Sequence, residues 1–158
     1  MSTLPEMIDA YVAGASALRH AVRGMSREQL RARPVPGKWS TLEVICHLAD
    51  FEPIFADRMK RVIAEERPAL LGADENRFQA ALAYQERDAD EELAIIEQTR
   101  RQMARILRTL DPEGWARVGV HSERGPRTLE QLVTGATNHI PHHVKFIHDK
   151  RRALGLPA

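Results

Sequence analysis

Residues 40–66 read STLEVICHLADFEPIFADRMKRVIAEE and predict one long amphipathic helix. Ser40 can accept a hydrogen bond from the backbone of Glu43, and the Glu43 side chain can reach back to Ser40, which is the capping box that begins many helices. Apolar residues then recur at spacings of three and four as far as Ile63, so we expect one face to be buried. Pro53 removes one backbone donor inside this span, so we expect a kink there.

Three other long segments carry the same helical periodicity, while runs of strict period-two alternation are almost absent. They extend from Leu4 to near Gly24, from residue 88 to residue 110, and from residue 128 to residue 147. Their starts are marked by Thr3 with Glu6, by Asp88 or Asp90, and by Thr128 with Gln131. The sequence therefore predicts an all-α protein, a four-helix bundle that forms one domain over residues 1–158.

The connections between these helices are less regular. A short helical turn is expected over residues 27–32, and Phe78 with its apolar neighbours favours a short helix within residues 73–87. Residues 113–127 contain three glycines and a proline and predict an ordered loop, with one extended piece over residues 118–121.

Composition excludes several classes of function. The chain has 23 Lys and Arg against 22 Asp and Glu, a net charge of +1, so we expect no nucleic-acid partner. Charged residues interrupt every apolar segment, so we expect no membrane span. Cys46 is the single cysteine and is expected to pack in the core, and the first residues lack the pattern of a secretory signal. A soluble, cytoplasmic protein is expected.

Histidines gather near the C-terminal end of the sequence. Successive residues of a helix are rotated by about 100°, so His139 and His143 lie about 40° apart, one above the other. Both project from the apolar stripe, whereas His142 falls on its flank and His148 on the opposite side. Two buried imidazoles need partners for their nitrogens, and a divalent cation would satisfy both.

A third ligand can come from the helix over residues 40–66. His47 lies there on the apolar side shared by Val44 and Phe51. Three histidines leave coordination positions open, which is typical of a catalytic metal site. The alternative is that His47 is an isolated core-edge histidine bonded to a backbone carbonyl.

Three acidic residues of the same helix also have two interpretations. They could cap the helix or lie in solvent, or one of them could orient a ligand histidine through its second nitrogen. These residues are Glu43, Asp50 and Glu52.

The three candidate histidines lie within two longer sequence motifs. The first motif is Pro36-Gly37-Lys38-Trp39-Ser40 followed by Glu43, His47-Leu48, Asp50 and Glu52. The second is Gly125-Pro126-Arg127-Thr128-Leu129 leading into His139-Ile140-Pro141-His142-His143. Both motifs resemble those of the DinB/YfiT-like superfamily of metal-dependent enzymes, and the resemblance covers nearly the whole chain.

The resemblance implies a four-helix bundle with a long crossover connection, commonly a homodimer. It also implies a divalent ion, nickel or zinc, held by His47, His139 and His143. Pro141 departs from the family pattern, which more often has an ordinary helix former between the two ligands. Because its ring crowds the carbonyl of Thr137, we expect the turn that carries both histidines to be kinked.

Relatives of this kind suggest two reactions on a small-molecule substrate. One is hydrolysis, in which the ion activates water, and the other is transfer or isomerisation with a low-molecular-weight thiol such as bacillithiol, mycothiol or glutathione as cosubstrate. Candidate catalytic or substrate-facing residues are Glu52, Arg58 and Arg101, each of which could instead form ion pairs. The competing hypothesis is a non-catalytic dimeric module that binds a metal or small ligand.

Overall fold

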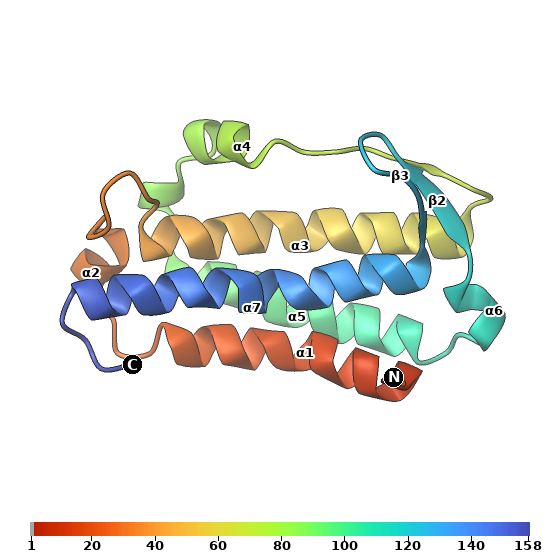
Figure 1. Ribbon diagram of the computed structural model, residues 1–158, viewed down its shortest axis with the longest axis horizontal. Coiled ribbons are helices and arrows are strands. Elements are labelled where there is room, and N and C mark those ends of the chain that lie inside the picture. Colours follow the sequence, from red (N-terminus) through yellow and green to blue (C-terminus); the bar gives the residue numbers. More distant parts are fainter. Residues whose placement is uncertain (1) are drawn as a thin grey trace.

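Four long helices make up the body of the protein, seen in a computed structural model that describes residues 2–158. They are α1 (Leu4–Ala21), α3 (Thr41–Ala64), α5 (Ala89–Leu107) and α7 (Leu129–Ala153). The helices lie side by side, and each of α1 and α3 packs against both α5 and α7 (Figure 1). The structure confirms the predicted four-helix bundle. None of the helices in residues 2–158 combines the length and the apolar character needed to cross a membrane.

The helices begin where their capping residues predict. Capping boxes are present at Thr3, Ser40 and Thr128, and Asp88 accepts a hydrogen bond from the backbone of Glu91 at the start of α5. Each cap satisfies a backbone N–H that the helix itself leaves unpaired. Local sequence therefore sets the first residue of every long helix.

Two helices contain an internal proline and continue through it. Pro53 lies within α3 and Pro141 within α7, both at exposed positions. Each proline removes one hydrogen bond from its helix, yet the helix resumes on both sides because packing of the buried face holds it.

The connections carry three short helices, a 3₁₀ turn and a small sheet. They are α2 (Arg27–Arg31), β1 (Ala69–Leu70), α4 (Glu75–Ala81), η1 (Tyr84–Glu86), α6 (Pro112–Trp115), β2 (Val118–His121) and β3 (Gly125–Thr128). Residues 65–88 return along the bundle, so α3 and α5 run in the same direction (Figure 1). This is the long crossover that the family resemblance implied.

The three-stranded sheet differs from the all-helical expectation. β2 lies in the middle, parallel to β1 and antiparallel to β3, with Ala69 opposite Val120 and Gly119 opposite Arg127. A Cβ at Gly119 would lie 2.8 Å from the Val62 side chain of α3, so glycine permits β2 to approach the bundle closely. The extended piece predicted over residues 118–121 is confirmed as β2, whereas β1 and β3 were not predicted.

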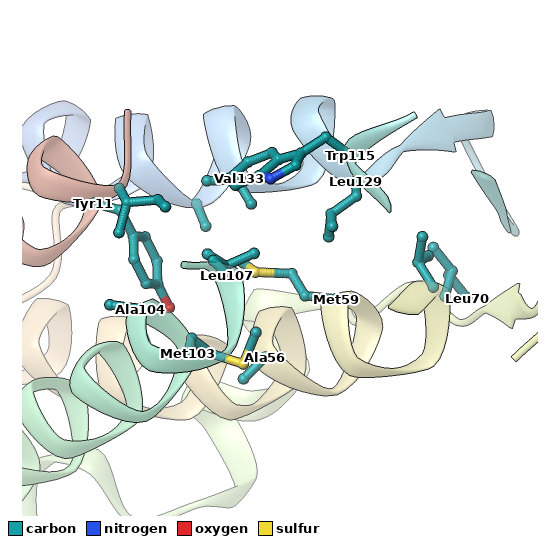
Figure 2. Close-up of a cluster of buried hydrophobic side chains, with 13 residues drawn as sticks. Tyr11, Ala56, Met59, Leu70, Met103, Ala104, Leu107, Trp115, Leu129 and Val133 are labelled. Atoms are coloured by element: carbon teal, nitrogen blue, oxygen red, sulfur yellow. The ribbon is translucent and has the colours of Figure 1, made fainter. Parts of the chain in front are cut away.

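The core consists of two main apolar clusters at successive levels of the bundle. One is shown in Figure 2, where Tyr11, Met59, Leu107 and Trp115 come together from four different helices. The other is formed by residues such as Leu18, Ile45, Leu48, Ile96 and Ile140. A buried ion pair lies where residues of both clusters meet.

The ion pair joins Arg100 of α5 to Glu52 of α3, and both side chains are fully buried. The guanidinium also donates to the backbone carbonyls of Tyr11 at 2.6 Å and Ala136 at 2.8 Å. A Cβ at Gly14 would overlap the guanidinium, so this glycine leaves room for it. Arg100 therefore connects its own helix to the other three.

We predict that Arg100→Ala destabilises the protein by about 3–5 kcal/mol, because it leaves the Glu52 carboxylate buried without a partner. The neighbouring Arg101 is exposed on α5, and Arg101→Ala is expected to change stability by less than about 0.5 kcal/mol. Urea unfolding followed by circular dichroism measures both. Equal effects of the two substitutions would contradict this role for Arg100.

Candidate metal centre

Three histidines from two helices meet at one point. The Nε2 atom of His47, on α3, lies 3.0 Å from that of His139 and 3.1 Å from that of His143, both on α7. His47 is buried, and the other two are half-buried. The structure thus brings together the three residues that the sequence singled out, although two of them are separated from His47 by more than ninety positions.

The remaining histidines lie outside this cluster. His142 is exposed beside it, as its position on the flank of the stripe predicts, while His148 is half-buried rather than on the surface. Among the described residues, the group of three histidines is the one arrangement of metal-ligating side chains with this close spacing.

Burial keeps the three imidazoles neutral. It lowers the pKa of His47 to about 3, of His139 to about 2 and of His143 to about 4, with further lowering from neighbouring imidazoles and, for His139 and His143, from Arg100 and Lys150 respectively. Neutral imidazole is the form that coordinates a metal, so near pH 7 each ring can offer a lone pair.

The cluster fits a divalent ion. Ligands that each lie 2.0–2.1 Å from one ion are separated from one another by roughly 3.0–3.4 Å, which is close to the observed spacing of Nε2 atoms around His47. Without a cation, a contact between two ring nitrogens needs a proton on one of them, so three converging nitrogens cannot all be satisfied by each other. An ion held here would lower the pKa of a bound water and polarise a carbonyl group.

Aromatic packing orients His47. Its Nδ1 atom is buried and has no hydrogen-bond partner within residues 2–158, so no carboxylate or carbonyl fixes the ring from behind. Instead the ring packs against Phe51, with centroids 4.6 Å apart, and against Trp39, with centroids 5.5 Å apart. Trp39, which precedes α3, therefore contributes to the site.

The three acidic residues near His47 are engaged elsewhere. Glu43 is fully buried and accepts hydrogen bonds from Arg33 and Gln79. Asp50 pairs with Arg87, and Glu52 pairs with Arg100. None of these partners is a histidine, so the hypothesis that one of these carboxylates orients a ligand histidine is wrong.

A cavity of about 510 Å³ opens above the histidines. It is bounded by α3, by residues 72–75, by the β2–β3 hairpin and by α7. The hairpin and the segment from β1 to α4 lie on the outer side of α3 and α7 (Figure 1). Phe51 and Phe55 give the cavity an apolar side next to the histidines. Its size suits a small molecule.

The three candidate catalytic or substrate-facing residues have different positions. Arg58 lines the cavity, where it donates two hydrogen bonds to the carbonyl of Leu71. Glu52 does not reach the cavity, because it is paired with Arg100 in the core, where burial raises its pKa. Arg101 is exposed on α5, one residue and about 100° away from the arginine that points inward.

Sequence reasoning missed four cavity residues. Glu75, the first residue of α4, places a carboxylate oxygen 3.6 Å from Nε2 of His47. The β2–β3 hairpin contributes His121, Arg124 and Arg127. Asp74 is a recognisable helix cap and could have placed Glu75 in a first turn, but nothing local indicates which helices this turn covers.

Comparison with known proteins identifies a family and structures that resemble this chain. A sequence model described as the DinB superfamily matches residues 10–147. The structure of YfiT from Bacillus subtilis, described as a probable metal-dependent hydrolase with an unusual four-helix bundle topology, has a TM-score of 0.91 at 26% identity. That comparison covers 99% of this chain and 91% of YfiT.

Two further comparisons are more distant or shorter. OB0782 of Oceanobacillus iheyensis, named as a metal-dependent hydrolase on the same provisional basis, is 28% identical over 130 residues, which cover 82% of this chain and 75% of that protein. The mycothiol-dependent maleylpyruvate isomerase has a TM-score of 0.71 at 14% identity, covering 91% of this chain and 60% of the isomerase. That level of identity shows a likeness of fold alone.

Glu43 generates a prediction about pH, because its contact with Gln79 holds α4 near the histidines. Burial acts to raise the pKa of Glu43, but hydrogen bonds from Arg33, Ser40 and Gln79 hold it below the ordinary value of 4.5. A carboxyl group with a lowered folded-state pKa stabilises the protein above its ordinary pKa and loses this effect as pH falls through the folded-state value. We expect Glu43→Gln to destabilise the protein by about 1–2 kcal/mol at pH 7 and by less below pH 4.5.

Denaturant unfolding of both proteins across this pH range measures the difference. Glu6→Gln, in the exposed capping box of α1, is the matched control and should have a smaller effect at pH 7. A constant difference between wild type and Glu43→Gln from pH 7 to pH 3 would contradict the assignment.

Proposed function

Because the chain belongs to the DinB superfamily, we propose that it is a metal-dependent hydrolase of small molecules, with His47, His139 and His143 holding a divalent ion. The observation that carries the proposal is the convergence of three neutral imidazole nitrogens at the base of a cavity. Three protein ligands leave room at an ion for water and substrate, which distinguishes catalytic sites from structural ones.

Glu75 supplies the proton transfer that hydrolysis needs. Its carboxylate lies 3.6 Å from Nε2 of His47, and its side chain is half-exposed at the cavity. From this position it accepts a proton from water as the water oxygen adds to the acyl carbon, and it returns the proton to the leaving group as the acyl bond breaks. Phe51 and Phe55 limit access of bulk water on one side.

The same experiments distinguish two alternative functions. Thiol-dependent transfer rests on a likeness of fold to an isomerase of low sequence identity, and a non-catalytic module would bind metal without turnover. The choice between nickel and zinc is left to metal analysis, since imidazole binds both. The homodimer stays a prediction.

We predict about one divalent ion per chain in protein purified without an affinity tag, as measured by plasma mass spectrometry. His139→Ala removes one of three ligands and should lower the content to a small fraction of this value. His142→Ala removes an exposed histidine from the same helix and should leave the content unchanged. Equal metal content in wild type and His139→Ala would overturn the site.

We predict that Glu75→Gln lowers kcat/KM for 4-nitrophenyl acetate by about 10²–10⁴-fold in metal-loaded protein, because the amide cannot accept a proton. Its metal content should stay at the wild-type level. Glu130→Gln, an exposed acid in the first turn of α7, is the control and should keep the wild-type rate.

Full activity of Glu75→Gln would refute the role of this carboxylate. Turnover that requires added glutathione, bacillithiol or mycothiol would favour the transferase instead. Metal binding without turnover of esters, amides or thiol acceptors would favour the non-catalytic module.

A further inference from the structure

The cavity has a second chemical feature besides the histidines. Arg58 enters it from α3, and Arg124 and Arg127 enter it from the β2–β3 hairpin. We call these three residues the arginine wall. They line the same 510 Å³ cavity as the histidine cluster, so one small molecule can contact both.

Among the described residues, the arginine wall forms no ion pair with neighbouring side chains, although Glu123 and Asp57 lie close enough to act on the pKa of Arg58. Within residues 2–158, every carboxylate oxygen lies more than 4.0 Å from the nitrogens of these three guanidinium groups, which is beyond the distance of an ion pair. Three acids line the cavity: Asp74 caps α4, Glu75 lies beside His47, and Glu123 lies on the hairpin with its carboxylate against Gly72. Glu123 is the acid beside the wall, and at His121 its charge opposes those of all three arginines. Three positive charges against one leave this end of the cavity positive.

Arg58 is the buried member of the wall. The residue is only 8% exposed, and its Nε and Nη2 atoms donate to the carbonyl of Leu71 at 3.2 and 2.6 Å. Its guanidinium also lies over the ring of Phe55, at 5.7 Å from the centroid. Burial and the nearby charge of Arg124 lower the pKa of Arg58. A buried cation without an anionic partner is unfavourable, and an anionic ligand would remove that cost.

His121 adds a neutral donor beside the wall. Its Nδ1 accepts a hydrogen bond of 3.1 Å from the backbone N–H of Glu123, so the neutral ring carries its proton on Nε2. Burial and the surrounding arginines lower the pKa of His121, which favours this neutral form. His121 also lines the cavity, where an N–H group can donate to an anion.

Gly135 keeps the space between α7 and the wall open. It lies within α7 and lines the cavity, and a Cβ built on it would meet no atom within 4 Å. Packing among the described residues therefore does not require glycine here, although glycine inside a helix costs about 0.5–1 kcal/mol relative to alanine. Residue 135 therefore borders open space, and a larger side chain here would occupy part of the cavity.

We propose that the arginine wall and His121 bind an anionic group, a carboxylate or a phosphate, at one end of the substrate while its ester or amide bond lies at the histidine cluster. The proposal rests on the proposed function and specifies its substrate class. Arginine forms charge-assisted, often paired hydrogen bonds to both anions, so the wall recognises their shared chemistry.

Binding of simple anions tests the wall without metal or turnover. Succinate and inorganic phosphate are titrated by calorimetry into chelator-treated protein at low salt. We expect at least one to bind, and Arg124→Gln/Arg127→Gln to weaken its binding about tenfold or more. Arg105→Gln/Arg108→Gln removes the same charge from the exposed end of α5 and should bind like wild type.

The preferred anion identifies the group that the wall takes. Absence of binding for both anions, or equal affinity in the hairpin variant and wild type, would overturn the proposal. Because this measurement uses metal-free protein, its result is independent of whether the histidines hold an ion. Arg58→Gln offers a second test, provided that its circular dichroism spectrum matches that of wild type.

Two matched esters test the link between the wall and the reaction. Mono(4-nitrophenyl) terephthalate carries a free carboxylate that the rigid ring holds away from its own ester carbonyl, and its methyl ester lacks the charge. In both, water adds to the aryl ester carbonyl, the bond to the phenol oxygen breaks, and 4-nitrophenol leaves. We expect metal-loaded protein to prefer the charged ester about tenfold in kcat/KM, and the hairpin variant to lose this preference while still hydrolysing the neutral ester. Hydrolysis of both at equal rates by wild type would overturn the proposal, whereas hydrolysis of neither would count against the proposed function.

Discussion

The bundle depends on the hydrogen bonds that the guanidinium of Arg100 donates. A buried cation is tolerated when its hydrogen bonds are satisfied, and those of Arg100 end on α1, α3 and α7. Its partner Glu52 lies five residues after His47, and Ala136, whose carbonyl it contacts, lies three residues before His139. The spacing of α3 and α7 is thereby set next to the point where the histidines meet. The same charge adds to burial in lowering the pKa of His139.

The residues of the site come from two kinds of structural element, the long helices and the connections between them. The histidines come from long helices packed at the core, so their nitrogens are held by many contacts on both sides. The arginine wall and Glu75 come largely from the crossover and the hairpin, which cover the outside of α3 and α7 (Figure 1). A rigid base with a covering built from loops is a common arrangement in enzymes, because loops can change without disturbing the core. The small sheet joins the two loop regions by pairing β1 with β2.

Local sequence was sufficient to predict the helices and part of the site. Capping boxes act over three residues and apolar stripes over three or four, so Ser40 with Glu43 and Thr128 with Gln131 could be recognised directly. The closeness of His139 and His143 follows from one helical turn. The apolar side of residues 40–66 suggested His47 as the third ligand, and the family motifs supported this choice and added the crossover.

Tertiary structure decided the features that depend on which surfaces meet. Arg100 and Arg101 are the same residue type at adjacent positions, and only packing of α5 against its neighbours buries one and exposes the other. Glu75, Arg124 and Arg127 lie on connections between the long helices. Contacts between distant parts of the chain place these connections beside the cavity. The sequence by itself thus determined the helices, their caps and the histidine pair, because these follow from interactions within a few residues. Tertiary structure decided that His47 lies beside the other two histidines, that Arg100 and Glu52 form a buried ion pair, and that arginines line the cavity. Each of these features joins residues far apart in the chain.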